Sequence, residues 1–167
     1  MLNFHLVKIA MRKIDQLLAE YGESHQNATN KAIHWICVPL IFFSVVGMVA
    51  SIPSGLVQEF LSDNPYANWA TVALIVMIAY YVALSIPLAV GMMLFSAFCL
   101  YLTRVVTAQG LTLWITCLVV FVLAWIGQFY GHKVEGKKPS FLKDLQFLLI
   151  GPAWLMHFIF KKIGIPY

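Results

Sequence analysis

Charge is scarce in this sequence of 167 residues. Lys and Arg number 11 and Asp and Glu 7, so charged residues make up only 11% of the chain. Soluble globular domains carry about 25% charged residues, and this shortage excludes an ordinary soluble domain. The 3 cysteines are isolated, which excludes a disulfide framework and a C-x-x-C metal site. No basic patch interleaved with polar residues occurs, so we expect no nucleic-acid partner.

Apolar residues take the place of the missing charges, at 61% of the chain. Several segments therefore have the length and composition of membrane-spanning helices. As one helix, the uncharged run 69–103 would be about 52 Å long, against a hydrocarbon thickness of about 30 Å. We therefore predict a turn near Pro87 and two spans within this run. The four predicted spans are 32–52, 69–85, 87–103 and 111–131.

Segments at both ends of the chain have a different pattern. Residues 1–22 place apolar residues on one side of a helix and charged residues on the other, which predicts an amphipathic helix. This helix would lie on the membrane surface or pack on the rest of the protein, and both interpretations stay open. The apolar segment 141–162 contains Lys143, Asp144 and a Gly151-Pro152 break, which predicts a kinked helix at the interface. The predicted fold class is an all-α integral membrane protein, with residues 1–167 as a single domain.

The distribution of charge predicts the orientation of the spans. The loop between the first two spans contains Glu59 and Asp63 but neither Lys nor Arg. Basic residues instead gather before the first span and after the fourth, so the positive-inside rule places both termini in the cytoplasm. An even number of spans, here four, is then required. We expect the membrane to be a bacterial inner membrane or the endoplasmic reticulum membrane.

The first group of polar residues precedes and enters the first span. Asn27, Asn30 and His34 are spaced i, i+3, i+7 and so share one face of a helix. Neutral imidazole is a common metal ligand, and an amide nearby could orient its other nitrogen. His25 precedes His34 by nine residues, about half a turn out of phase on an ideal helix. His25 can therefore join His34 only if the helix starts after it.

A second group leaves the membrane at the end of the fourth span. Trp125, Gln128, His132 and Glu135 are spaced i, i+3, i+7, i+10, again on one helical face. Di-iron bundles use a Glu and a His three residues apart to present two ligands, but the pair occurs once here, which favours a single metal. His157 has no polar neighbours at helical spacing, so we interpret it as an interface residue and a secondary candidate ligand.

Imidazole ligands without thiolates suit iron(II), zinc or manganese, and the residue types alone do not distinguish these metals. A zinc site with a bound water would imply hydrolysis of a lipid amide or ester. An iron(II) site would imply oxygen chemistry. A third alternative is a lipid-binding membrane protein that is not an enzyme and whose histidines are incidental.

The two polar faces carry motifs that resemble a known family, the iron(II)-dependent 2-hydroxy fatty acid dioxygenases of phytosphingosine (sphingolipid) degradation and their bacterial relatives. The likeness extends from about Leu17 to the C-terminus. One motif is H-x-N-x-x-N-x-x-x-H, matched by His25, Asn27, Asn30 and His34. The other is W-x-x-Q-F-x-G-H, matched by Trp125, Gln128, Phe129, Gly131 and His132.

This resemblance implies α-oxidation, in which a 2-hydroxy fatty acid loses its carboxyl carbon as CO2. It implies Fe(II) as the cofactor, with zinc left open, and a 2-hydroxy fatty acid, O2 and membrane lipids as partners. The oligomeric state stays open. The expected site has three classes of residue: His25, His34 and His132 as ligands; Asn27, Asn30, Gln128 and Glu135 as groups that orient the ligands or accept the hydroxyl proton; and Lys31 or Lys133 as the charge that neutralises the substrate carboxylate.

Overall fold

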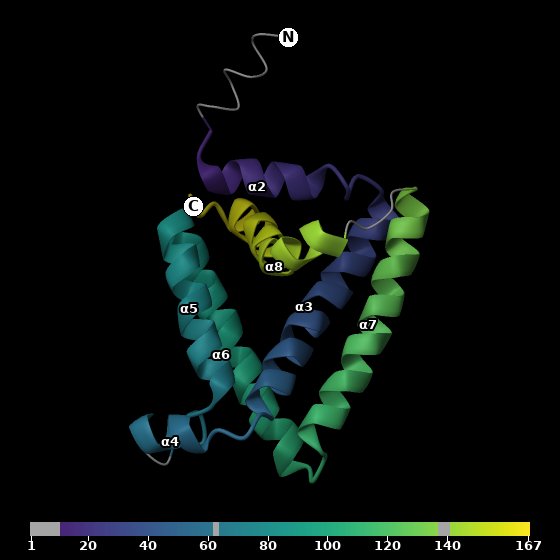
Figure 1. The fold of residues 1–167 in the computed structure, drawn as a ribbon. Helices are drawn as coiled ribbons and strands as arrows, with labels where there is room; N and C mark the ends of the chain where they lie inside the picture. The colour runs from purple at the N-terminus through teal and green to yellow at the C-terminus, as the bar shows by residue number, and fades with distance from the viewer. Residues whose placement is uncertain (1–10, 62–63, 137–140) are drawn as a thin grey trace.

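The structure is a computed structural model that describes residues 11–61, 64–136 and 141–167, with Leu61 and 141–147 as backbone alone. Within these ranges the chain is all-helical, as predicted, and contains no strand. Figure 1 shows the arrangement of its helices. They are α2 (Lys13–Gly22), α3 (Ala28–Ala50), α4 (Gly55–Leu61), α5 (Trp69–Leu84), α6 (Ile86–Ala108), α7 (Leu113–Glu135) and α8 (Phe141–Ile163).

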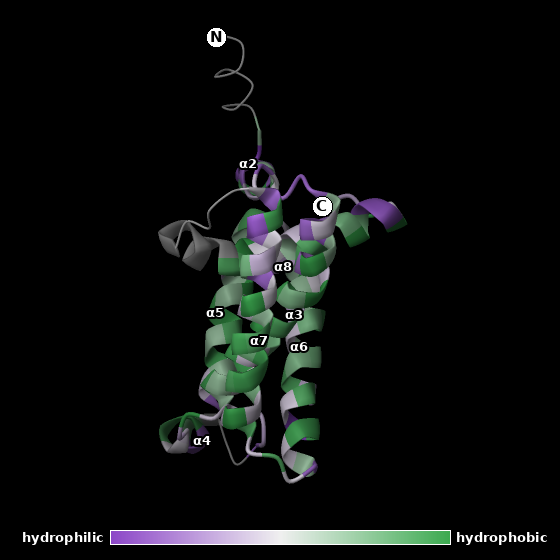
Figure 2. Ribbon diagram, turned by 90° about the vertical axis from the view of Figure 1, so that its right-hand side faces the viewer, coloured by the Kyte–Doolittle hydropathy of each residue, from purple (hydrophilic) through white to green (hydrophobic). Residues whose placement is uncertain are grey.

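Apolar helices occupy all of the predicted spans. Each of α3, α6 and α7 has 23 residues and is long and apolar enough to cross a membrane. The apolar helix α5 has 16 residues and is therefore only about 24 Å long. The chain turns between α5 and α6 at Ser85, close to the predicted turn. Figure 2 shows apolar residues along these helices and hydrophilic residues towards the end that carries α2.

Small residues bring α3 and α7 close together along their length. A Cβ added at Gly47 of α3 would lie 2.2 Å from the Cys117 sulfur of α7. A Cβ at Gly127 of α7 would lie 2.7 Å from the Cys37 sulfur of α3. Glycine is thus needed at these levels for the two backbones to approach, as is common between membrane helices. This close pair positions the polar residues at its α2 end.

The helix α2 buries its apolar side against α8. Four apolar residues of α2 are each at most 6% exposed and belong to one cluster with Ile150, Trp154 and Leu155 of α8. Of the two interpretations of this amphipathic segment, packing on the rest of the protein is the one that the structure favours. Residues 1–10 of the predicted helix lie outside the described residues. The four buried residues are Ile14, Leu17, Leu18 and Tyr21.

The C-terminal helix α8 lies beneath α2 and packs against α3 and α6 (Figure 1). It matches the helix predicted over 141–162 and continues through Pro152. One turn before this proline, the buried Tyr81 hydroxyl of α5 donates a hydrogen bond to the Leu149 carbonyl. This contact fixes α8 to the α5–α6 pair. The predicted kink stays a prediction.

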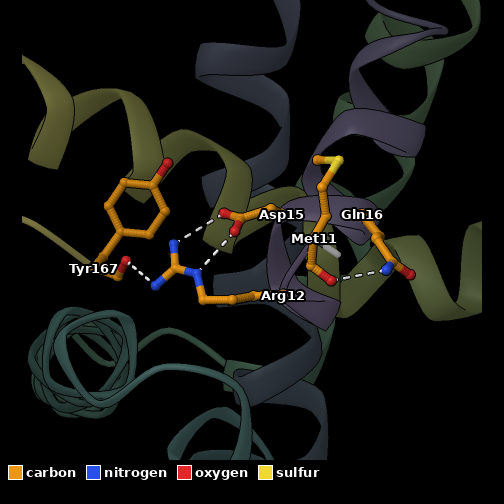
Figure 3. Close-up of polar contacts among 5 residues, drawn as sticks. All are labelled: Met11, Arg12, Asp15, Gln16 and Tyr167. Carbon is orange, nitrogen blue, oxygen red and sulfur yellow. Dashed lines mark hydrogen bonds and ion pairs between the residues drawn. The ribbon is translucent and has the colours of Figure 1, made fainter. Parts of the chain in front are cut away.

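Arg12 connects the start of α2 to the C-terminal residue (Figure 3). Its guanidinium donates to the Asp15 carboxylate at 2.8 and 3.1 Å and to the Tyr167 backbone oxygen at 2.5 Å. Beside it, the Gln16 side chain donates to the Met11 carbonyl at 2.9 Å. Arg12 is exposed, so these bonds contribute little to stability. They nevertheless place α2 and the C-terminal residue at the same end of the bundle.

Candidate metal centre

Three histidines from separate parts of the chain meet at the α2 end of the bundle. His25 lies in the loop after α2, His34 lies on α3, and His132 lies in the last turn of α7. The ring centroids are 4.2 Å apart for His25 and His34, 5.1 Å for His34 and His132, and 5.4 Å for His25 and His132. All three residues are buried, and one nitrogen from each ring lies within 4.8 Å of the others. The cluster could therefore hold a metal ion.

The local sequence places His25 at this cluster. The helix α2 ends at Gly22, whose carbonyl then accepts a hydrogen bond from the His25 amide at 3.0 Å. The helix α3 begins only at Ala28, because Asn27 caps it and accepts hydrogen bonds from two amides of its first turn. The helix thus starts after His25, which is the condition under which His25 and His34 can meet.

Backbone carbonyls fix the His25 and His34 rings. The Nδ1 of His25 lies 2.6 Å from the Tyr21 carbonyl oxygen, and the Nδ1 of His34 lies 2.9 Å from that of Asn30. Because a carbonyl oxygen can only accept, each Nδ1 carries the hydrogen and each neutral ring presents a lone pair at Nε2. Both Nε2 atoms are buried without a hydrogen-bond partner. This arrangement fits metal ligands, whose second ring nitrogen is usually bonded to a carbonyl or carboxylate.

Glu135 connects the end of α7 to the start of α3. Its Oε1 accepts a hydrogen bond from the Gln26 amide at 2.8 Å. Its Oε2 accepts from the Asn27 amide at 2.9 Å and from the Asn30 side-chain amide at 3.1 Å. All three donors belong to the loop that carries His25 or to the first turn of α3, the helix that carries His34, while the carboxylate belongs to α7, which carries His132. One side chain therefore fixes the two parts of the cluster relative to each other.

Asn30 is fully buried and holds both histidines of its segment. Its carbonyl accepts from the His34 ring, and its side-chain amide also donates to the Ser24 carbonyl at 3.2 Å. Ser24 and Gln26 are the two chain neighbours of His25, so hydrogen bonds to Asn30 and Glu135 hold the loop on both sides of the ring. Asn27, by contrast, acts as a helix cap, and its side chain bonds amides of the first turn.

The face of α7 that meets α3 contributes two further residues. A Cβ at Gly131 would lie 2.4 Å from the Asn30 Oδ1, so glycine is needed where the two helices approach most closely at the site. Gln128 is buried, and its side chain faces His34. Gln128 and His132 of the predicted polar face of α7 therefore lie at the cluster, whereas Trp125 packs beside Phe121 and Phe129.

Aromatic rings form a wall beside His25. The Tyr21 ring stacks on the His25 ring, with centroids 4.2 Å apart and an interplanar angle of 11°. The ring of Trp154, a residue of α8, lies with its centroid 5.4 Å from that of His25. Burial lowers the pKa of His25 from 6.5 to about 4, so that this imidazole stays neutral at physiological pH. Sequence reasoning missed both aromatic residues. A signal existed only for Tyr21, which stands one helical turn before His25.

The remaining residues predicted from the sequence are His157, Lys31 and Lys133, and none of them is one of the three clustered histidines. His157 packs against the rings of Phe158 and Tyr167, and among the described residues it is not part of the three-histidine cluster. Lys31 is half-buried, and its charge lowers the pKa of His25. Lys133 is exposed. Lys31 lies three residues before His34 on α3, and Lys133 directly follows His132 on α7, so both lysines adjoin the cluster in the sequence.

One protein-family model matches the chain over residues 11–163, and its description is 2-hydroxy-palmitic acid dioxygenase Mpo1-like. Among the curated proteins and the solved structures, none matches the chain significantly. The matched residues include all three histidines of the cluster and every helix from α2 to α8. The family match and the geometry thus concern the same part of the molecule.

Proposed function

The chain belongs to the Mpo1-like family, and we propose that it is a membrane dioxygenase that shortens 2-hydroxy fatty acids by one carbon. The observation that carries this proposal is the buried cluster of His25, His34 and His132, which could hold a metal ion. Three imidazoles without a thiolate suit iron(II), and the family description supports oxygen chemistry. We therefore propose Fe(II) as the metal, with these three histidines as its ligands.

The proposed reaction converts R–CHOH–COOH and O2 to R–COOH, CO2 and H2O, which balances in atoms. The substrate gives up four electrons and O2 accepts four, so that no flavin or nicotinamide is required. Bound iron(II) would supply the centre at which substrate and O2 exchange these electrons. The chain contains none of the glycine-rich fingerprints for nucleotide cofactors, which agrees with this stoichiometry.

The residues around the cluster have distinct proposed roles. The Nε2 atoms of His25 and His34 bind the metal, since their Nδ1 atoms donate to carbonyls. Lys31, three residues before His34, or Lys133, directly after His132, neutralises the substrate carboxylate. Glu135 already accepts three hydrogen bonds, so we assign it to positioning and not to proton transfer. Gln128, which faces His34, orients that ring or the substrate hydroxyl.

We also propose that the apolar helices α3, α5, α6 and α7 all cross the membrane, with both termini in the cytoplasm. The α2 end carries the C-terminal residue and most of the basic residues that the structure describes, whereas the opposite end carries α4 with Glu59 (Figure 1). The short helix α5 is supported as a span by its packing along α6. The metal centre then lies at the cytoplasmic surface of a bacterial inner membrane or of the endoplasmic reticulum.

The test is to purify the protein in detergent without chelator or nickel resin and to measure its metal content and its turnover of a 2-hydroxy fatty acid. We expect about one iron per chain, with O2 uptake and CO2 release in equal amounts. Stoichiometric zinc with product formed under anaerobic conditions would instead identify a lipid hydrolase. The absence of stoichiometric metal would favour a lipid-binding protein that is not an enzyme. Either result would overturn the proposal.

A further inference from the structure

A groove with a volume of about 550 Å³ lies between α3 and the last turns of α8. This volume is within the range of small-molecule sites, about 300–1,000 Å³. The histidines of the metal centre do not line it, although Trp35 directly follows His34 in the chain. The lining residues are Trp35, Phe158, Ile159, Lys161, Lys162 and Ile163.

The walls of this groove are apolar and open to the surroundings. Trp35 is 43% exposed, Ile159 40% and Ile163 59%. Contiguous exposed apolar side chains of this size mark an interaction site for lipid, ligand or protein. Tryptophan is typical of the membrane–water interface, where its ring contacts both acyl chains and headgroups. The position of Trp35 near the start of α3 therefore favours a lipid as the occupant.

Among the described residues that line the groove, Lys161 and Lys162 carry the charge. Lys161 and Lys162 are exposed in the last turn of α8. The ion pair found among the described residues joins Arg12 and Asp15, so no described carboxylate neutralises either lysine. Lysines at this depth direct their ammonium groups to the headgroups while their stems cover apolar surface. The groove thus combines apolar walls with an uncompensated positive end.

We propose that this groove binds an anionic phospholipid, with the phosphate beside Lys161 and Lys162 and one acyl chain along Trp35. Basic pockets between membrane helices on the cytoplasmic side recognise anionic headgroups in this way. Because the groove is open, a bilayer lipid can enter it without leaving the membrane. The proposal rests on the proposed membrane insertion and orientation but not on the proposed reaction.

A free fatty acid fits the groove less well. The Phe158 ring packs edge-on against Trp154 at 4.7 Å, and Trp154 lies 5.4 Å from His25. Trp154 thus contacts both the groove residue Phe158 and His25. No histidine of the metal centre lines the groove, so a carboxylate held by the lysines would not lie against the imidazoles, and the groove is a poor site for the substrate.

Trp35 offers a direct test by fluorescence quenching. The protein is placed in nanodiscs of phosphatidylcholine that contain a small, equal mole fraction of either brominated phosphatidylglycerol or brominated phosphatidylcholine. Subtracting the signal of Trp35→Phe isolates the contribution of this residue from the other tryptophans. At low ionic strength we expect roughly tenfold preferential occupancy by the anionic lipid, equivalent to about 1.4 kcal/mol.

Charge-matched variants make the result specific. Lys161→Gln with Lys162→Gln should remove the preference for the anionic lipid. The control pair, Lys13→Gln on α2 with Arg104→Gln on α6, removes the same charge away from the groove and should keep the preference. Equal quenching by both lipids, or equal loss in both double variants, would overturn the proposal. Quenching of Trp35 by a brominated fatty acid alone would also overturn it. Since the readout needs neither metal nor turnover, it is independent of the outcome for the enzyme activity.

Discussion

The carboxylate of Glu135, the last residue of α7, accepts a hydrogen bond of 3.1 Å from the side-chain amide of Asn30, which lies 105 residues earlier on α3. Two backbone amides, of Gln26 and Asn27, donate to the same carboxylate. The site is therefore connected across its two halves by a residue that is not one of its proposed ligands. Such second partners hold ligands in place before the metal binds, which lowers the ordering cost of binding.

Glu135→Ala should weaken metal binding by roughly 10- to 100-fold, the usual effect of removing an outer partner of the ligands. The substitution leaves three donors without their acceptor and frees the loop that carries His25. Glu135→Gln keeps the shape of the side chain and one acceptor oxygen, so the decrease in metal affinity should be smaller than in Glu135→Ala. The measurement is metal content at equilibrium with a series of buffered free iron(II) concentrations, under anaerobic conditions.

Glu59→Ala is the matched control, because this exposed carboxylate lies on α4 at the opposite end of the bundle. It should leave metal affinity unchanged. Hydrogen exchange of the amides of Gln26 and Asn27 gives a second readout, and these amides should exchange faster in Glu135→Ala only. Unchanged affinity together with unchanged exchange would show that Glu135 does not position the site.

Single substitutions of the clustered histidines should abolish metal binding and turnover together. His34→Ala removes a buried Nε2 that has no hydrogen-bond partner and so is expected to bind the metal. His157→Ala is the control, since His157 lies outside the cluster and should leave the metal-to-protein ratio unchanged. Metal analysis of the folded, monodisperse fraction checks both variants. Retained iron with retained activity in His34→Ala would reject the ligand assignment.

Much of this architecture could be predicted from the sequence, because its signals are local. Long uncharged runs predict apolar helices, and Pro87 with the excess length of the run 69–103 predicts the turn now found at Ser85. Helical spacing also predicts that Asn30 and His34 share a face, as do His132 and Glu135. Whether His25 joins them depends on a single helix boundary, which Asn27 sets by capping α3.

Other features could not be predicted, because they depend on contacts between distant segments. The position of Trp154 beside His25 requires α8 to pack beneath α2, and helical periodicity in 141–162 does not specify that partner. The same limit applies to α2. Its sequence alone does not specify whether its apolar side faces lipid or protein. Gly131 appears in a motif, but its purpose, close contact with Asn30, is visible only once α3 and α7 are paired.

Gly131→Ala should destabilise the protein and impair the metal site. Its Cβ would lie 2.4 Å from the Asn30 Oδ1, in a fully buried place where Asn30 is held by hydrogen bonds to Ser24 and Glu135. Overpacking of this kind costs about 1–3 kcal/mol. Thermal unfolding in detergent should therefore show a lower midpoint, and metal affinity should fall in the same variant.

Gly55→Ala provides the control for this substitution, because a Cβ at Gly55 meets nothing within 4 Å. It adds the same methyl group at the start of α4 without a new contact. If the thermal unfolding midpoints of Gly131→Ala and Gly55→Ala are equal, then α3 and α7 can move apart at this level without loss of stability.

The stability of the metal-free protein should depend on pH through His25. Burial lowers the pKa of this residue from 6.5 to about 4. Between these values the unfolded chain binds a proton at His25 and the folded chain does not, so the free energy of unfolding is highest above pH 6.5 and falls as the pH drops towards 4. The difference between the two pKa values corresponds to at most about 3 kcal/mol. Thermal unfolding at pH 7.5 and pH 4.5 measures this loss, which should be smaller in His25→Gln than in the parent protein. An equally steep decline in both proteins would mean that His25 titrates normally and that its ring is accessible to water.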